Sequence, residues 1–126
     1  MKKYIILGLQ WLLVLFFIIP GIMKVTGEAS IREVFSGFGY SLGFMYFIGV
    51  CEILGALGIA FGRHIHSMIP KLAVIGLIII MVGALYNHVN SGEAFSVAMP
   101  ALINLVLLGV YFKILLKDSV RGRIEV

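Results

Sequence analysis

Polar residues divide the chain into four long apolar stretches. These are Tyr4 to Met23, Leu42 to Phe61, Leu72 to Tyr86 and Val97 to Leu116. A stretch of about 20 apolar residues is long enough to cross a bilayer as a helix, and the third reaches that length if it continues into Asn87 and His88. The pattern predicts an all-α fold, an integral membrane four-helix bundle. We expect helices at about residues 4–24, 42–62, 71–89 and 97–117, forming a single transmembrane domain over residues 1–126.

The longest polar break, residues 24–41, predicts a further short helix between the first two membrane spans. Ser30 and Glu33 have the spacing of a capping box, in which the two side chains satisfy free amide groups at a helix start. Apolar residues follow, so the helix would lie in the outer interface and end at Gly37 and Gly39. An irregular loop is the alternative.

Composition excludes several classes of protein. Of the 126 residues, 61% are hydrophobic and 13% are charged, which is typical of a membrane protein. The net charge of +4 does not indicate nucleic-acid binding, because the basic residues lie at the ends of apolar segments and form no patch with interleaved aromatics. Cys51 is the one cysteine, which excludes an intramolecular disulfide and a Cys-x-x-Cys motif.

Most basic residues fall on one side of the four-helix layout. On that side lie Lys2, Lys3, Arg63, Lys71, Lys117, Arg121 and Arg123, with Lys113 able to reach it. Lys24 and Arg32 fall on the other side. The positive-inside rule then predicts that both termini are cytoplasmic. A cleaved secretory signal is the alternative for the first stretch, but its apolar run is too long and no Ala-x-Ala site follows it.

Small residues form a stripe on the second membrane helix. Cys51, Gly55, Gly58 and Gly62 recur at spacings of four, three and four, which places them where another helix can approach closely. Glu52 lies about 100 degrees around the helix from this stripe. We therefore expect the Glu52 carboxyl, whose ionised form costs about 2.5 kcal/mol or more at the bilayer centre, to face the bundle.

Each predicted helix carries a polar group inside the membrane. At 1.5 Å per residue, Gln10 lies about 9 Å from the cytoplasmic boundary, Glu52 near the midplane, and Asn104 about 10 Å below the outer boundary. His88 lies within about 6 Å of that boundary and Lys24 close to it. These depths allow a chain of hydrogen bonds from Gln10 through Glu52 and Asn104 toward His88 and Lys24. Without a cationic partner, we expect Glu52 to be protonated and to donate a hydrogen bond.

Two histidines, His64 and His66, lie in the inner loop beside Arg63. Metal sites usually need three or four ligands, and no further ligand is near in sequence. We interpret the segment as a solvated basic turn and expect no metal site.

Three interpretations compete for the polar groups. They either hold the helices together, bind a polar-headed apolar ligand such as a quinone, or form a proton or substrate pathway. In the second case, His88, Lys24 or a protonated Glu52 would donate hydrogen bonds to the ligand carbonyls.

Three of the predicted helices each carry a short motif. They are Gln10 and Pro20-Gly21-Ile22-Met23-Lys24-Val25-Thr26-Gly27, then Gly49-Val50-Cys51-Glu52-Ile53-Leu54-Gly55, then Met81, Ala84 and His88. With these motifs the chain resembles the DoxX family of small four-helix membrane proteins over most of its length. The resemblance implies a bundle in the bacterial cytoplasmic (inner) membrane. The family includes a subunit resembling part of thiosulfate:quinone oxidoreductase, and members associated with other redox systems.

The chain departs from this family at Gln10. Members often carry arginine there, and that arginine would be the natural partner of the glutamate that matches Glu52. Glutamine removes the cation, and Lys24, placed about 15 Å higher, is a poor replacement. We therefore do not expect a charged pair across the first two helices.

We expect a small subunit or accessory of a membrane redox system that is linked to quinone. The candidate residues of an outward-facing polar pocket are Glu52, His88, Lys24, Asn104, Gln10 and Asn87. No motif for flavin, haem or metal is recognisable, so we do not expect catalysis by the chain alone, and a quinone is the one cofactor considered. We expect a homo- or hetero-oligomer in the lipid bilayer, with a redox enzyme subunit as partner. The alternatives are a proton-linked small-solute carrier and a non-enzymatic membrane assembly or scaffold protein.

Overall fold

The computed structural model describes residues 2–92 and 95–125, with side chains for residues 3–92 and 98–117. Within these residues the regular structure is entirely helical. The helices are α1 (Lys2–Val25), α2 (Ala29–Gly37), α3 (Leu42–Phe61), α4 (Met68–Asn90) and α5 (Phe95–Glu125), and a 3₁₀ turn, η1 (Gly62–His64), follows α3. The all-α fold and the short helix between the first two spans are confirmed.

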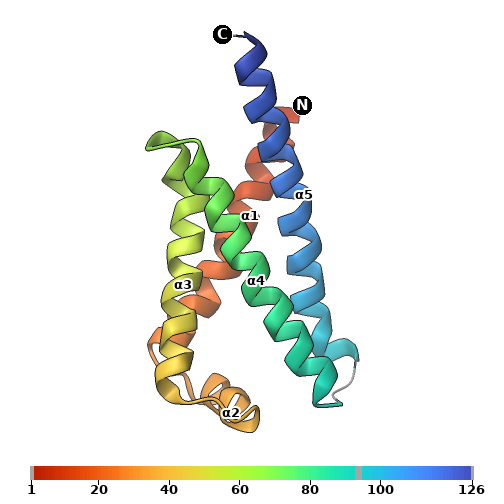
Figure 1. Cartoon of the computed structure of the whole chain (residues 1–126). Helices are drawn as coiled ribbons and strands as arrows, with labels where there is room; N and C mark the ends of the chain where they lie inside the picture. The colour runs from red at the N-terminus through yellow and green to blue at the C-terminus, as the bar shows by residue number, and fades with distance from the viewer. Residues whose placement is uncertain (1, 93–94, 126) are drawn as a thin grey trace.

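Four of the helices form a bundle that is long enough to cross a membrane. The spans are Lys3–Val25, Leu42–His64, Met68–Asn90 and Ala98–Lys117. Helix α1 packs most extensively against α3, α4 packs against both α3 and α5, and α5 packs against α1 (Figure 1). Helix α2 lies at the end of the bundle opposite the two termini. The chain is therefore a multi-pass membrane protein.

Two helix boundaries differ from the expected ones. Helix α4 begins at Met68, because Pro70 is tolerated in a first turn, where its missing amide would have no partner in the helix. Nδ1 of His66 accepts a hydrogen bond from the Met68 amide at 3.0 Å, so this histidine provides a partner for the first amide of the helix, which has none within it. Helix α5 continues to Glu125, well beyond Leu116, where the apolar run ends. An apolar run marks the part of a helix that lies in lipid, and polar residues can extend the helix into water.

The capping box expected in α2 is not formed. Helix α2 begins at Ala29 with Glu28 as its N-cap, so Ser30 lies inside the first turn. The Ser30 hydroxyl donates a hydrogen bond to the Glu28 carboxylate, which lowers the pKa of Glu28. The prediction of the helix was correct. The prediction of its start was wrong, because the Ser30 hydroxyl donates to the Glu28 carboxylate and does not cap a backbone amide.

Buried apolar side chains fill the half of the bundle that lies toward the termini. The fully buried members of this core are Leu13, Phe17, Ala56, Ile59, Val74, Leu77 and Leu108. They come from α1, α3, α4 and α5. Many apolar side chains on the outside of the four spans are exposed, as expected for surfaces that face lipid tails.

The small-residue stripe on α3 packs against α4. A Cβ added at Gly55 would lie 2.7 Å from the Leu77 side chain, and one added at Gly58 would lie 2.8 Å from Cβ of Ala73. No room exists there for a larger residue on α3. The stripe is thus confirmed as a helix–helix interface, with α4 as its partner.

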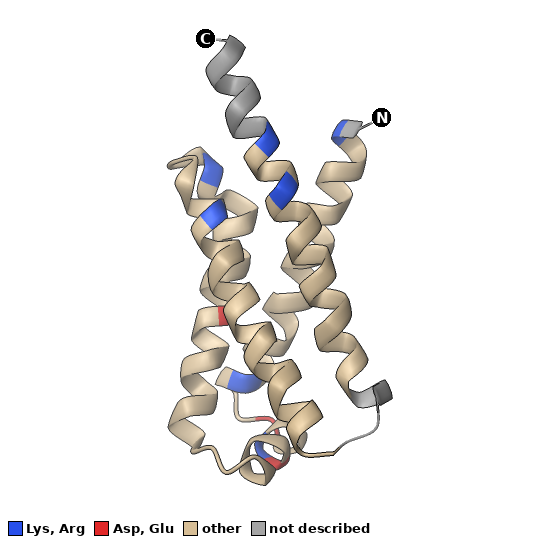
Figure 2. Ribbon diagram, turned by 45° about the vertical axis from the view of Figure 1, so that its right-hand side comes forward, with Lys and Arg blue, Asp and Glu red and all other residues tan. Residues whose placement is uncertain are grey.

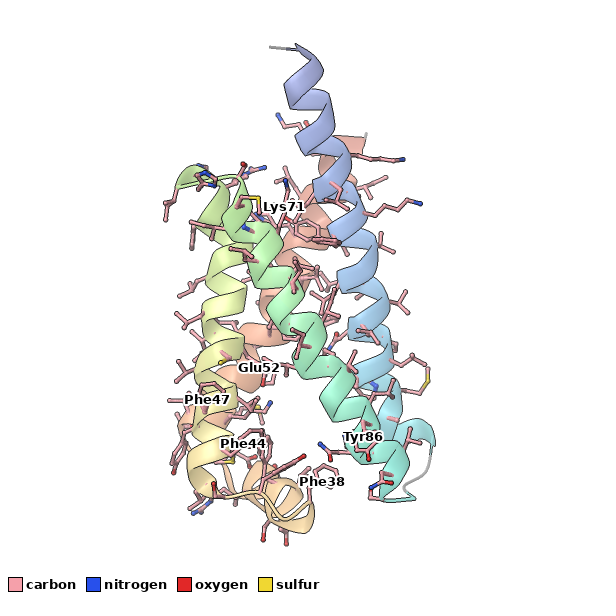
Figure 3. The ribbon with its side chains drawn as sticks, viewed as in Figure 1. Phe38, Phe44, Phe47, Glu52, Lys71 and Tyr86 are labelled. Atoms are coloured by element: carbon pink, nitrogen blue, oxygen red, sulfur yellow. The ribbon has the colours of Figure 1, made fainter. Side chains whose placement is uncertain are left out.

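Charged side chains gather at the two ends of the bundle. In Figure 2, outside the grey C-terminal segment, the charged residues coloured at the end with the termini are basic, whereas the α2 end carries both signs. The side chains of Lys2, Arg121 and Arg123 lie outside the described ones. Lys71, one of the basic residues expected at the end with the termini, is a buried residue in the first turns of α4 and not part of an open loop. One acidic residue, Glu52, lies at mid-height on α3 (Figure 3).

Candidate functional site

Helices α1 and α3 cross in close contact at two glycines. A Cβ added at Gly21 would lie 3.1 Å from the carbonyl oxygen of Gly49, and one added at Gly49 would lie 2.9 Å from the carbonyl oxygen of Gly21. The same added atom at Gly49 would lie 2.8 Å from Cβ of Lys24, and that at Gly21 would lie 3.3 Å from Cβ of Glu52. The crossing therefore sets Lys24 and Glu52 at neighbouring levels.

At this crossing Lys24 and Glu52 form an ion pair. The Lys24 Nζ lies 2.7 Å from the Glu52 Oε1, and the two side chains are 14% and 2% exposed. The expected separation of about 15 Å was wrong. That estimate put Lys24 at the outer boundary because the apolar run ends beside it. The glycine crossing instead brings the Lys24 Cβ level with Gly49, so that its ammonium reaches Glu52. The premise of a neutral Glu52, the lack of a cationic partner, does not hold.

The geometry of the pair is that of two charges in contact. Oε1 of Glu52 is fully buried and has no hydrogen-bond partner of good alignment among the described residues, although Lys24 Nζ is close to it. The pair lies in surroundings of low polarity, where charges interact strongly. The ammonium keeps N–H donors for a further acceptor.

A cavity of about 480 Å³ lies next to the ion pair, between α2, α3 and α4. Lys24 and Glu52 line one end of it. Five aromatic residues line the rest, together with aliphatic side chains: Phe35, Phe38, Tyr40, Phe44 and Phe47. In Figure 3, Phe47 and Phe44 follow Glu52 along α3 toward α2, and Phe38 lies at the α2 end. The cavity is thus apolar along its walls and charged at one end.

Two contacts join the far end of α4 to the segment that follows α2. The Tyr40 hydroxyl donates a hydrogen bond to Oδ1 of Asn87 at 3.1 Å. The ring of Phe38 lies edge-on to His88, with ring centroids 5.4 Å apart. Asn87 and His88 also line the cavity. These contacts join α4 to the segment after α2 at the α2 end of the cavity.

Four of the six candidate residues from the sequence therefore surround one cavity: Lys24, Glu52, Asn87 and His88. Gln10 lies elsewhere. Its amide nitrogen donates to the carbonyl oxygen of Ala60 at 3.4 Å, and its oxygen accepts from the Tyr111 hydroxyl at 3.4 Å. Asn104 is half-buried on α5 and is not part of the cavity wall. The expected hydrogen-bond chain from Gln10 to Glu52 is not formed, because Gln10 pairs with groups nearer the termini.

The aromatic wall was missed in the sequence. Its signal was present, since Phe35 and Phe38, and then Phe44 and Phe47, are three residues apart and so share helix faces. Apolar residues at such spacing are common on any membrane helix, however, and nothing in their pattern distinguishes a cavity wall from a lipid-facing surface.

The comparisons with known proteins identify the family of the chain. The model of the DoxX-like family matches residues 8–110 of the chain, which run from the second turn of α1 to the middle of α5 and include part or all of each span. The chain belongs to the DoxX-like family. Neither the curated proteins nor the solved structures contain a significant match. The membership establishes the fold of this DoxX-like protein, and its activity has to be argued from the cavity.

The chemistry available in this DoxX-like protein is recognition of a polar-headed apolar molecule. Ring faces and aliphatic side chains pack against an apolar body, and the Lys24 ammonium beside Glu52 offers donors to a carbonyl oxygen. His88 and Asn87 add polar groups at the opposite end. Such a division, with mostly apolar walls and few polar groups, is typical of sites for small organic ligands.

Proposed function

We propose that this DoxX-like protein is a small subunit or accessory of a membrane redox system and holds a quinone in the aromatic cavity. The observation that carries the proposal is the Lys24–Glu52 ion pair at one end of an aromatic-lined cavity between α2 and two of the candidate membrane spans, α3 and α4. The chain would hold and orient the quinone, and a partner subunit would supply the electrons.

The cavity has a suitable size and chemistry for a quinone ring. Its volume of about 480 Å³ lies within the range of roughly 300–1,000 Å³ that small-molecule sites occupy. A flat ring can stack against phenylalanine faces, and its carbonyl oxygens need donors. Lys24 supplies one donor group, and the buried Oε1 of Glu52 fixes the position of that ammonium. A quinone diffuses in the bilayer and can enter beside Phe47, which is 61% exposed to the lipid.

Binding can be tested by thermal unfolding of the purified protein in detergent. A ubiquinone or menaquinone analogue should raise the melting temperature, because a ligand at 100 times its Kd adds about 2.7 kcal/mol to the stability of the folded state. Gly83→Leu should remove the rise, because Gly83 lines the cavity and an added Cβ meets no atom within 4 Å there. His88→Ala should reduce it.

Gly109→Leu is the matched control. Gly109 is also an exposed helical glycine with open space around its Cβ position, but it lies on α5, away from the cavity. This variant should keep the full ligand-dependent rise. The proposal fails if wild-type protein shows no rise with either analogue, or if Gly83→Leu and Gly109→Leu respond alike.

The cavity favours ligand holding over transport. A carrier must open a path to both sides of the membrane, whereas beyond Glu52 the bundle is filled by buried side chains such as Phe17, Ile59 and Leu77. A proton-linked carrier would instead show proton flux in reconstituted vesicles that Glu52→Gln abolishes. An assembly or scaffold protein would show neither flux nor quinone binding.

The charge distribution supports an orientation with both termini in the cytoplasm, in a bacterial inner membrane. Arg63 and Lys117 lie toward the end of the bundle that carries the termini, while Glu28 and Glu33 lie with Arg32 at the α2 end. A green fluorescent protein fused to the C-terminus should therefore fluoresce, and alkaline phosphatase fused there should be inactive. The reverse pattern would place α2 and the neighbouring end of the cavity on the cytoplasmic side.

A further inference from the structure

A second hollow continues from the cavity along the outside of the bundle. It also has a volume of about 480 Å³ and lies between α3 and α4, nearer to the termini. Leu54, Gly55 and Gly58 line it from α3, and Leu72 and Gly76 line it from α4. We call it the α3–α4 groove.

The groove and the cavity are continuous. Cys51, Ile79 and Ile80 line both of them. On α4 one helix face runs through both, since residues 72, 76, 80, 83 and 87 follow each other at spacings of three or four. A single elongated molecule can therefore occupy the cavity with one end and the groove with the other.

The groove opens to the lipid and has apolar walls. Leu54, Leu72 and Ile79 line it and are 62%, 59% and 66% exposed. From Ile80 to Ile69, which mark its extent on α4, the groove runs about 16 Å at 1.5 Å per residue. Apart from the thiol of Cys51, its lining side chains carry no polar atom.

The shape and position of the groove favour a chain-like occupant. Its length of about 16 Å and its apolar walls suit one extended hydrocarbon chain. Because the groove shares Cys51, Ile79 and Ile80 with the cavity, a molecule held in the cavity can place such a chain there.

We propose that the α3–α4 groove holds the isoprenoid tail of the quinone whose ring lies in the aromatic cavity. This inference rests on the function proposed above and adds the tail site to it. A phospholipid fits less well. With its acyl chain in the groove, its phosphate would lie in the cavity, where it would meet phenylalanine rings and a lysine that Glu52 already neutralises. Ordinary lipid contact with the groove would not depend on what occupies the cavity.

The test compares a ubiquinone analogue without a tail and one with a two-isoprene tail, using a binding titration on each protein variant. Gly76→Leu fills the groove at a position where an added Cβ meets no atom within 4 Å. Because the tail gains no hydrophobic burial on leaving lipid, its contribution comes from packing contacts and is modest. We expect Gly76→Leu to weaken the tailed analogue by roughly fivefold and to leave the tail-less one unchanged. Partitioning of the tailed analogue into the detergent affects all variants equally, so the change between variants is the informative quantity.

Leu54→Trp, which narrows the groove from the exposed side of α3, should give the same selective loss, and Gly109→Leu should give none. Equal Kd values for the tailed analogue in wild type, Gly76→Leu and Leu54→Trp would overturn the tail site while leaving the ring site intact. A change of oligomeric state in both groove variants, or displacement of the tailed analogue by a saturated phospholipid, would also overturn it. If neither analogue binds the wild type, the proposed function fails and the tail site fails with it.

Discussion

Lys24→Met should lower the free energy of unfolding by about 3 kcal/mol, the low end of the range for breaking a buried ion pair. The Lys24 ammonium lies 2.7 Å from a Glu52 carboxyl that is almost fully buried, so its removal leaves a carboxyl without its charged partner inside the bundle. Glu52→Met should have an effect of similar size, because it leaves the ammonium in the same position. Unfolding in mixed micelles with increasing dodecyl sulfate measures both effects.

The double variant Lys24→Met with Glu52→Met distinguishes an ion pair from two independent contacts. Replacing a whole buried pair by apolar residues is often neutral, so the double variant should be more stable than either single variant. Lys113→Met, which removes an exposed cation from the membrane-spanning part of α5, is the matched control and should change stability little. Strictly additive losses in the double variant would show that the two side chains do not interact.

Gly49→Ala is expected to destabilise the bundle by about 1–3 kcal/mol, although alanine favours helices over glycine. The added methyl carbon would lie 2.9 Å from the backbone oxygen of Gly21 and 2.8 Å from Cβ of Lys24. A backbone atom cannot turn aside as a flexible side chain does, so α1 and α3 must move apart. That movement also weakens the Lys24–Glu52 pair, which depends on the crossing.

Gly109→Ala gives the control for the helix preference itself. Its added carbon meets nothing within 4 Å, so this change should be neutral or stabilising by up to about 1 kcal/mol. The same denaturation assay compares the two variants. If Gly49→Ala is as stable as Gly109→Ala, the close crossing of α1 and α3 does not exist in the folded protein.

The fold could be predicted from the sequence because it depends on local features. The length of the apolar runs sets the four spans, and the spacing of Gly55 and Gly58 marks a helix interface. The burial of Glu52 follows from its place beside that stripe. The exact start of α2 was wrong, since it depended on whether the Ser30 hydroxyl would bond to Glu28 or to a backbone amide.

The candidate site was only partly predictable, because it depends on the register between helices. Lys24 and Glu52 were both recognised, but the sequence gives no depth for one helix relative to another. Their pairing follows from the contact between Gly21 and Gly49, which places two helix backbones together at one level. The assignment of Gln10 to the same polar chain was wrong for the same reason. Its partners Ala60 and Tyr111 became neighbours only through the packing of α3 and α5.

The most direct test of the quinone site is photolabelling with a quinone analogue that carries a reactive group on its ring, followed by mass spectrometry of the labelled peptides. The proposed function predicts labels within residues 35–51 and 79–88, which contain most of the side chains that line the aromatic cavity, with loss of these labels in Gly83→Leu and their retention in Gly109→Leu. Labels confined to the lipid-facing surface of α5, or unchanged by Gly83→Leu, would contradict it.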